Sequence, residues 1–290
     1  MAWLYIVLIA YFINAFVFVI DKYLLSTKIP KPFAYAFWIS VLSLAILILI
    51  PFGVQLQEFN FFIIAFVSGA LLFLGNILLF KIVKLADASV AATKVGALTA
   101  IFTYVFSLLI LKEVFLLSNF FAIAFLILGI LFLGKIRKGI MVHALISGIF
   151  FGLSLVLLKL AFTEAGFLNG LFWTRIGFIG GALISLLFSQ VREEVYFSFR
   201  QAPPKSKFTF IFNQVFSAIG FLLVYYAILL GNVSLVNALL GVEFVFIFFL
   251  TMFLRNKIPA IAENLKRGVL AYKLLGIAFV VAGFLMILLQ

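Results

Sequence analysis

The sequence has 290 residues, of which 67% are hydrophobic and 10% are charged, with a formal net charge of +12. Soluble domains carry about 25% charged residues, so this composition excludes a soluble globular domain. It indicates an all-α membrane protein with many membrane-spanning helices. The excess Lys and Arg are expected to flank the spans on the cytoplasmic side, so no nucleic-acid partner is expected. With no Cys and one His, thiol chemistry is excluded, and neither a metal site nor a cofactor is expected.

Ten apolar segments follow one another, and each is read as a membrane-spanning helix. The first lacks a basic start and a small-residue cleavage site, which favours a retained helix. The long connections after the seventh and ninth segments mix basic and apolar residues, so each is expected to lie along the membrane interface as an amphipathic piece. The predicted segments are residues 2–20, 33–51, 60–80, 88–111, 118–134, 141–162, 168–190, 208–230, 233–254 and 271–289.

The distribution of basic residues predicts an orientation in the membrane. Seventeen of the 21 Lys and Arg residues fall in odd-numbered connections, whereas Lys112 alone clearly falls in an even-numbered one. Because basic loops stay in the cytoplasm, the count favours both termini outside. The residues counted are Lys22, Lys28, Lys31, Lys81, Lys84, Lys135, Arg137, Lys138, Arg192, Arg200, Lys205, Lys207, Arg255, Lys257, Lys266, Arg267 and Lys273.

Small and polar residues of the first half recur in the second half, in order and across three pairs of segments. This pattern favours duplication of a five-helix unit, with repeats at residues 1–138 and 139–290. Five is odd, so the second repeat crosses the membrane upside down, as in many secondary transporters, whose substrate site lies near the midplane. The matched residues are Gly75 and Gly220, Asp87 and Asn232, Ser89 and Ser234, Gly96 and Gly241, Phe37-Trp38 and Phe172-Trp173, Ala122 and Gly276, and Gly129 and Gly283.

Two charges of opposite sign stand inside predicted spans. Lys94 lies about 9 Å along its segment and Glu243 about 15 Å along another that enters from the opposite side. In a core about 30 Å thick both fall in the middle third, about 6 Å apart in height. Such charges are costly and usually functional, so we expect them to share a cavity, paired when it is empty. The alternative for Lys94 is snorkelling to the headgroups.

The chain also resembles a known family. Leu111-Lys112-Glu113, followed by Ala122 and Gly129, is similar to a pattern of the EamA-like branch of the drug/metabolite transporter superfamily. The resemblance covers essentially the whole chain, although the second half has Arg255-Asn256 in place of Lys112-Glu113. It implies export or exchange of small metabolites, amino acids or drugs without an ATP-binding domain, in the cell membrane. It also implies both termini in the cytoplasm, opposite to the charge count.

Further polar and aromatic residues form stripes at helical spacing and are candidate substrate contacts. For each stripe, hydrogen bonding between helices is an alternative explanation. Asp21 lies on the same predicted face as Asn14, and Arg175 is a candidate clamp for an anionic group. Together with Lys94 and Glu243, the predicted substrate-binding residues are Asn14, Asn76, Trp38, Trp173, Arg175, Gln214, Tyr225 and Asn237.

These features favour a secondary transporter for a small polar metabolite, such as an amino acid or another zwitterion, with a proton as a candidate coupling ion. A transporter of a phosphorylated sugar or nucleotide-sugar remains an alternative, with Lys159 as an additional cation, and so does a flippase for a lipid-linked precursor. A membrane-embedded lipid enzyme is disfavoured, because His143 has no paired carboxylates nearby. The expected partners are a small-molecule substrate and the lipid bilayer, and two fused repeats suffice as a monomer, with a homodimer as the other option.

Overall fold

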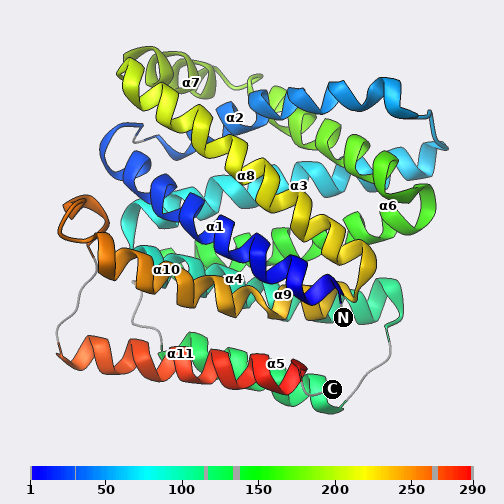
Figure 1. The fold of residues 1–290 in the computed structure, drawn as a ribbon. Helices are drawn as coiled ribbons and strands as arrows, with labels where there is room; N and C mark the ends of the chain where they lie inside the picture. The colour runs from blue at the N-terminus through cyan, green and yellow to red at the C-terminus, as the bar shows by residue number, and fades with distance from the viewer. Residues whose placement is uncertain (1, 30, 114–116, 133–137, 263–266, 289–290) are drawn as a thin grey trace.

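The computed structural model describes residues 2–29, 31–113, 117–132, 138–262 and 267–288, which form an all-helical bundle without strands (Figure 1). The predicted ends at residues 134 and 289 lie outside these ranges, as do Lys135, Arg137 and Lys266 of the charge count. The elements are α1 (Ala2–Thr27), α2 (Pro32–Leu42), η1 (Ser43–Phe52), α3 (Phe59–Leu85), α4 (Ala88–Phe106), η2 (Ser107–Leu111), α5 (Leu117–Phe132), α6 (Lys138–Ser185), α7 (Ser189–Gln201), α8 (Pro204–Leu230), α9 (Val233–Ala238), α10 (Leu240–Leu254), η3 (Pro259–Ile261) and α11 (Arg267–Leu288).

Seven of the described helical stretches are long and apolar enough to cross a membrane, where the sequence predicts ten. One stretch, Gly139–Ser185, combines two predicted segments, and two further apolar helices are shorter, Phe120–Gly129 and Gly268–Gly283. Gly166 interrupts the long stretch with a positive φ of 77° and ψ of 171°, a conformation that favours glycine. The chain bends at Gly166, and the bend brings Gly170 against the Phe162 ring.

The connection after the seventh predicted segment is helical, as the sequence predicts for an interfacial piece. It forms α7, which crosses one end of the bundle beside α2 (Figure 1). After α10, the second predicted interfacial piece contributes the short 3₁₀ helix η3, and residues 263–266 of it lie outside the described ranges.

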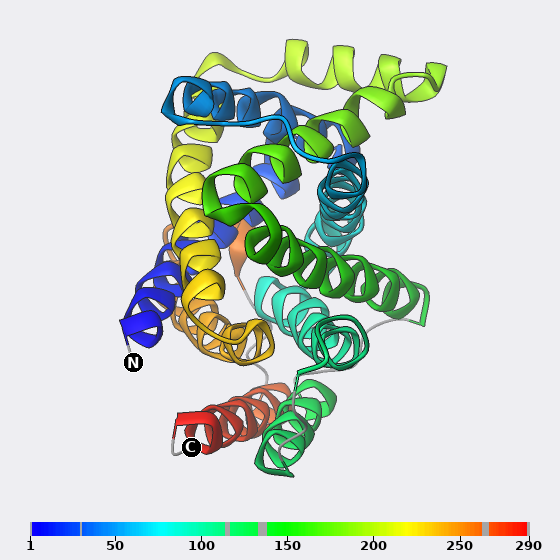
Figure 2. The same ribbon diagram turned by 90° about the vertical axis from the view of Figure 1, so that its right-hand side faces the viewer.

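Helices α5 and α11 pack against each other as a layer beside the main bundle (Figure 2). Gly129 lies against the Gly276 carbonyl and Val280, and Gly283 lies against the Ala122 carbonyl and Leu126. Each glycine lets the facing backbone approach, as small residues do between membrane helices. The four small residues matched in the sequence therefore form one reciprocal seam.

Reciprocal contacts also join α3 to α6 and α8 to α1. Gly75 of α3 packs on the Phe151 ring of α6, and Gly220 of α8 packs on Asn14 of α1. One turn or two away, Ser68 donates to the Ser154 carbonyl at 2.7 Å, and Asn213 donates to the Val17 carbonyl at 3.2 Å. The α3 residue of each contact has its counterpart in α8 145 positions later in the chain. The α6 residue has its counterpart in α1 137 positions earlier, so the same two offsets relate both sets of contacts.

Two lysines make matching contacts at the ends of α3 and α8. Lys22 was expected in a loop, but α1 extends past it and buries it. The Nζ of Lys22 donates to two backbone carbonyls at the end of α3. The Nζ of Lys159 donates to three backbone carbonyls at the end of α8. Both lysines thus satisfy carbonyls that have no partner within their own helix. The acceptors are Val83 and Ala86 for Lys22, and Ile228, Leu229 and Gly231 for Lys159.

Candidate functional site

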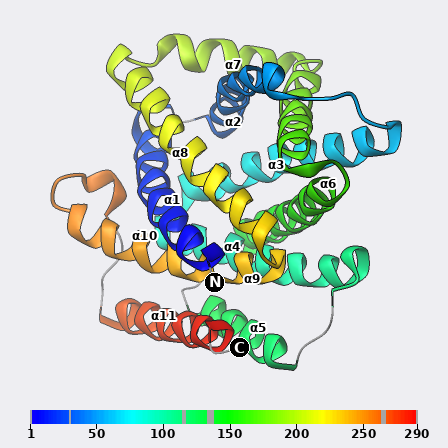
Figure 3. The ribbon, with the colours of Figure 1, turned by 45° about the vertical axis from the view of Figure 1, so that its right-hand side comes forward.

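Helices α1 and α8 lie against each other (Figure 3), and both carry several buried polar side chains. The two helices run antiparallel, since Asn14 lies against Gly220 whereas Asp21 binds Asn213. Buried polar groups inside membrane helices are rare and mark candidate functional sites. The buried polar residues on these two helices are Tyr11, Asn14, Asp21, Lys22, Ser206, Asn213, Gln214, Ser217 and Tyr225.

Arg175 and Tyr225 form one part of the candidate site. The Arg175 guanidinium donates to the Tyr225 hydroxyl at 3.3 Å and lies 5.3 Å from the centre of the Tyr225 ring. The rings of Phe178 and Phe221 lie 5.7 and 5.9 Å from it. Aromatic faces attract a guanidinium and fix its position. Arg175 is half-buried, and a guanidinium offers five donors, so it can also bind an anionic ligand group.

Glu243 and Tyr11 form the other part of the candidate site. Glu243 is buried in α10 and interacts electrostatically with Tyr11, whose hydroxyl donates to the Val236 carbonyl at 2.7 Å. Tyr11 and Tyr225 belong to one buried cluster. Tyr11 is thus placed near the buried acid Glu243, and Tyr225 binds the half-buried cation Arg175. We name Tyr11, Arg175, Tyr225 and Glu243 the tyrosine site.

Asp21 is the centre of a second polar group, toward the other end of α8. Its Oδ1 accepts hydrogen bonds from Tyr35 at 2.5 Å, Asn213 at 2.7 Å and Gln214 at 3.4 Å. Asp21 is only 6% exposed, so these donors replace the water that a carboxylate would otherwise bind. No charged side chain of the described residues forms an ion pair with it.

Two amide oxygens on this interface accept no hydrogen bond from the described residues. They are Oδ1 of Asn14 and Oδ1 of Asn213, and both are buried. The Asn213 assignment is fixed by its Nδ2, which faces two acceptors, Asp21 and the Val17 carbonyl. Buried acceptors without donors are costly, so this interface has capacity for a hydrogen-bond donor.

Lys94 and Glu243 do not form the expected ion pair in the described part of the chain. Helices α4 and α10 do pack together, because Gly96 lies against the Phe244 ring. Lys94 precedes Gly96 by two residues, which corresponds to about 200° around an α-helix. The Lys94 side chain therefore projects from α4 on the side opposite to the contact with Phe244. Lys94 is nevertheless buried, with 5% exposure. Their similar depth in the membrane stays a prediction, and rotation about the helix axis directs Lys94 away from α10.

The remaining predicted residues are distributed over several places. Trp38 lines a cavity between α2 and α7, whereas Trp173 lines a groove between α3 and α6 and donates to the Gln55 carbonyl at 3.1 Å. Asn76 donates to the Leu72 carbonyl of its own helix at 2.9 Å. Asn237 is buried and donates to Thr103 at 3.1 Å. The hydrogen bonds described for these residues do not involve the tyrosine site, although Asn237 directly follows Val236, whose carbonyl accepts from Tyr11. Their role as substrate contacts stays a prediction.

Tyr11, Asp21 and Asn213 are buried polar residues that the sequence-based site omits. Asp21 stands next to Lys22, and the pair resembles the charged end of a span, which is why the first segment was ended at residue 20. The signal available was Asp21's position on the same helical face as Asn14. Within the described residues, no cluster of three His, Asp or Glu side chains is placed to hold a metal ion.

Residues 1–135 match the model of the EamA-like transporter family. This part of the chain is similar to an EamA-like transporter domain. The match and the apolar helices make the protein a multi-pass integral membrane protein related to drug/metabolite transporters. A crystal structure of a protein is similar at a TM-score of 0.61 and 18% identity, with 97% of both chains covered, and this likeness shows the fold alone. A comparison with curated proteins gave no match.

The tyrosine site draws on both halves of the chain. The EamA-like domain supplies Tyr11, together with Asn14 and Asp21, from α1. The part of the chain after this domain supplies Arg175, Tyr225 and Glu243. A site assembled from two halves changes shape when the halves move relative to each other.

Proposed function

We propose that the protein is a secondary transporter with alternating access for a small polar metabolite, such as an amino acid or another zwitterion. The EamA-like domain and the apolar helices support the transporter class. The observation that carries the substrate class is the tyrosine site, where a half-buried Arg175 and a buried Glu243 flank two tyrosines.

The proposed architecture is two inverted five-helix repeats, residues 1–138 and 139–290. The reciprocal contacts support it, because exchanged partners at fixed offsets are what a twofold-related duplication produces. Gly75 and Gly220 meet equivalent residues, and Lys22 and Lys159 cap equivalent helix ends. Counting α6 as two spans and adding α5 and α11 gives ten. In such transporters the substrate site lies between the repeats.

The chemistry assigned to each group follows from charge and hydrogen-bonding capacity. Arg175 binds the substrate carboxylate with its fork of donors, and the Tyr225 ring keeps the guanidinium in place. Glu243 accepts from the substrate ammonium group, or carries the coupling proton when no substrate is bound. Asn14, whose amide oxygen has no donor, offers a further acceptor on the same face of α1.

A phosphorylated sugar or nucleotide-sugar fits this site less well. A dianion needs several available cations, but Lys159 already binds the carbonyls at the end of α8. Arg175 is then the one cation of the tyrosine site, and Glu243 would repel a second negative charge.

The test is uptake into proteoliposomes of radiolabelled amino acids and related zwitterions, preceded by a thermal-shift screen of the same panel. A ligand that binds the folded state stabilises it by an amount that rises with the logarithm of the ligand concentration above the Kd, so a hit appears as a raised melting temperature. We expect saturable uptake of at least one compound by the wild type, and loss of both uptake and thermal shift for Arg175→Ala and Glu243→Gln.

Arg255→Ala is the matched control, because Arg255 is exposed at the end of α10, outside the site. It should transport like the wild type. Uptake of a nucleotide-sugar but of no zwitterion would overturn the substrate class. Saturable zwitterion uptake that is unchanged in Arg175→Ala and Glu243→Gln would overturn the site.

A further inference from the structure

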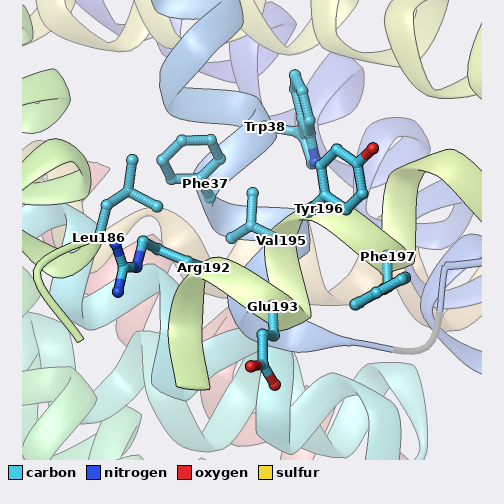
Figure 4. Close-up of a pocket in the computed structure, with 8 residues that line it drawn as sticks. All are labelled: Phe37, Trp38, Leu186, Arg192, Glu193, Val195, Tyr196 and Phe197. Carbon is cyan, nitrogen blue, oxygen red and sulfur yellow. The ribbon is translucent and has the colours of Figure 1, made fainter. Parts of the chain in front are cut away.

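A cavity of about 500 Å³ lies between α2 and α7, away from the tyrosine site. Figure 4 shows its lining, with aromatic and aliphatic side chains gathered on one side of α7. The lining residues are Phe37, Trp38, Leu186, Arg192, Glu193, Val195, Tyr196 and Phe197. Volumes of 300–1,000 Å³ with an apolar lining and a few polar groups are typical of ligand sites.

The helix that covers this cavity has the properties of an interfacial helix. It crosses the end of the bundle, and its sequence SQVREEVYFSFRQ mixes charged and apolar residues (Figure 2). Val195 packs into the core, whereas Tyr196 and Phe197 are 58% and 54% exposed. Leu187 and Phe188, just before α7, are also exposed. Amphipathic helices with exposed aromatic rings lie at the boundary between lipid headgroups and acyl chains.

Cationic groups stand at both sides of the cavity. Arg192 lines it, and Arg200 donates to the Tyr196 hydroxyl at 2.7 Å, with its guanidinium 5.7 Å from the Tyr196 ring. Both arginines are exposed. Glu193 also belongs to the lining, but Figure 4 shows its carboxylate directed away from the rings of Trp38 and Tyr196. Basic pockets between membrane helices attract anionic lipid headgroups.

We propose that this cavity binds an anionic phospholipid, with an acyl chain against Phe37, Trp38 and Tyr196 and the phosphate held by Arg192. Arg200 adds a second cation on the Tyr196 side. The apolar lining and the two arginines together select this occupant. A zwitterionic lipid offers the same phosphate but adds an ammonium group that the two arginines repel, and a soluble anion satisfies only the arginines. The site is independent of the transported substrate.

The chain contains a matched pair of fluorescent reporters for the test. Trp38 lines the proposed lipid site, and Trp173 lines a groove of about 310 Å³ made of apolar residues without a cation. The chain has three Trp in total, so Trp3→Phe/Trp173→Phe leaves Trp38, and Trp3→Phe/Trp38→Phe leaves Trp173. Each protein is titrated with brominated phosphatidylglycerol or brominated phosphatidylcholine, whose bromines quench a contacting indole.

We expect phosphatidylglycerol to quench Trp38 at lower concentration than phosphatidylcholine does, whereas the two lipids should quench Trp173 equally. Arg192→Ala in the Trp38 protein should weaken the phosphatidylglycerol effect about fivefold, the expected contribution of one basic residue near the surface. Arg255→Ala should leave it unchanged. Equal quenching of Trp38 by both lipids would overturn the headgroup assignment, and absence of quenching would overturn the lipid site.

Discussion

At the scale of single residues, burial assigns different roles to charges that look alike in the sequence. Lys22 and Lys159 complete the ends of helices and are therefore structural. Arg175 is held by aromatic rings and keeps donors available. Lys94 and Glu243 were predicted to meet because they lie at similar depth, but depth leaves the rotation around each helix undetermined. Contacts between helices decide which charges meet, and these contacts cannot be read from the sequence.

Asp21 supplies the first prediction. Replacing it with Ala removes the acceptor for three donors, among them Tyr35 and Asn213, and leaves them buried without a partner. We expect a loss of about 2–3 kcal/mol in the free energy of unfolding, the cost of unsatisfied buried polar groups. Asp21→Asn keeps the acceptor oxygen and should lose less than half as much. Thermal unfolding in detergent measures both, and equal stability of Asp21→Ala and the wild type would contradict the assignment.

At the scale of helices, hydrophobic runs predicted the elements well, and boundaries failed where charges are buried. The first segment was ended at residue 20 because Asp21 and Lys22 follow, yet α1 continues to Thr27 and buries both. The amphipathic helix α7 was predicted from its mixture of basic and apolar residues. The bend at Gly166 lies in the predicted connection between residues 162 and 168, and its non-helical backbone separates α6 into two helical parts.

The two lysine caps supply the second prediction. Lys22→Met and Lys159→Met each remove the donor to backbone carbonyls at a helix end. We expect each variant to lose about 2 kcal/mol of stability, since a hydrogen bond from a charged donor is lost and its acceptors stay buried. Lys28→Met, at the exposed end of α1, serves as the control and should be neutral. If only one cap variant is destabilised, the two helix ends are not equivalent.

Glycine contacts supply the third prediction. A Cβ at Gly69 of α3 would overlap with the Thr174 carbonyl and the Phe178 amide of α6, so the helices would have to separate. Gly69→Ala should therefore destabilise the protein by about 1–3 kcal/mol, as overpacking does. At Gly139, near the start of α6, a Cβ meets nothing within 4 Å, so Gly139→Ala should be tolerated. Comparable melting temperatures for the two variants would argue against close contact of α3 with α6.

At the scale of the whole molecule, α5 and α11 form a layer beside the bundle that carries the tyrosine site. An ion pair joins this layer to the bundle, because Lys273 of α11 lies 3.0 Å from Asp87, the residue before α4. Asn232, matched to Asp87 in the sequence, instead accepts hydrogen bonds from the first amides of α9. Asn232 is therefore the N-cap of α9.

This ion pair supplies the fourth prediction. Lys273 is 1% exposed and Asp87 is 32% exposed, so Asp87→Ala removes an ion-pair partner of a buried charge. We expect it to cost about 2–3 kcal/mol, below the usual range for a fully buried pair because Asp87 reaches solvent. The double variant Asp87→Ala/Lys273→Met should be more stable than Asp87→Ala alone, since no buried charge then loses its partner. A double-mutant cycle by thermal unfolding measures the coupling energy between Asp87 and Lys273. Additive effects would contradict the prediction, and would show that the α5–α11 seam and other contacts hold the layer without this ion pair.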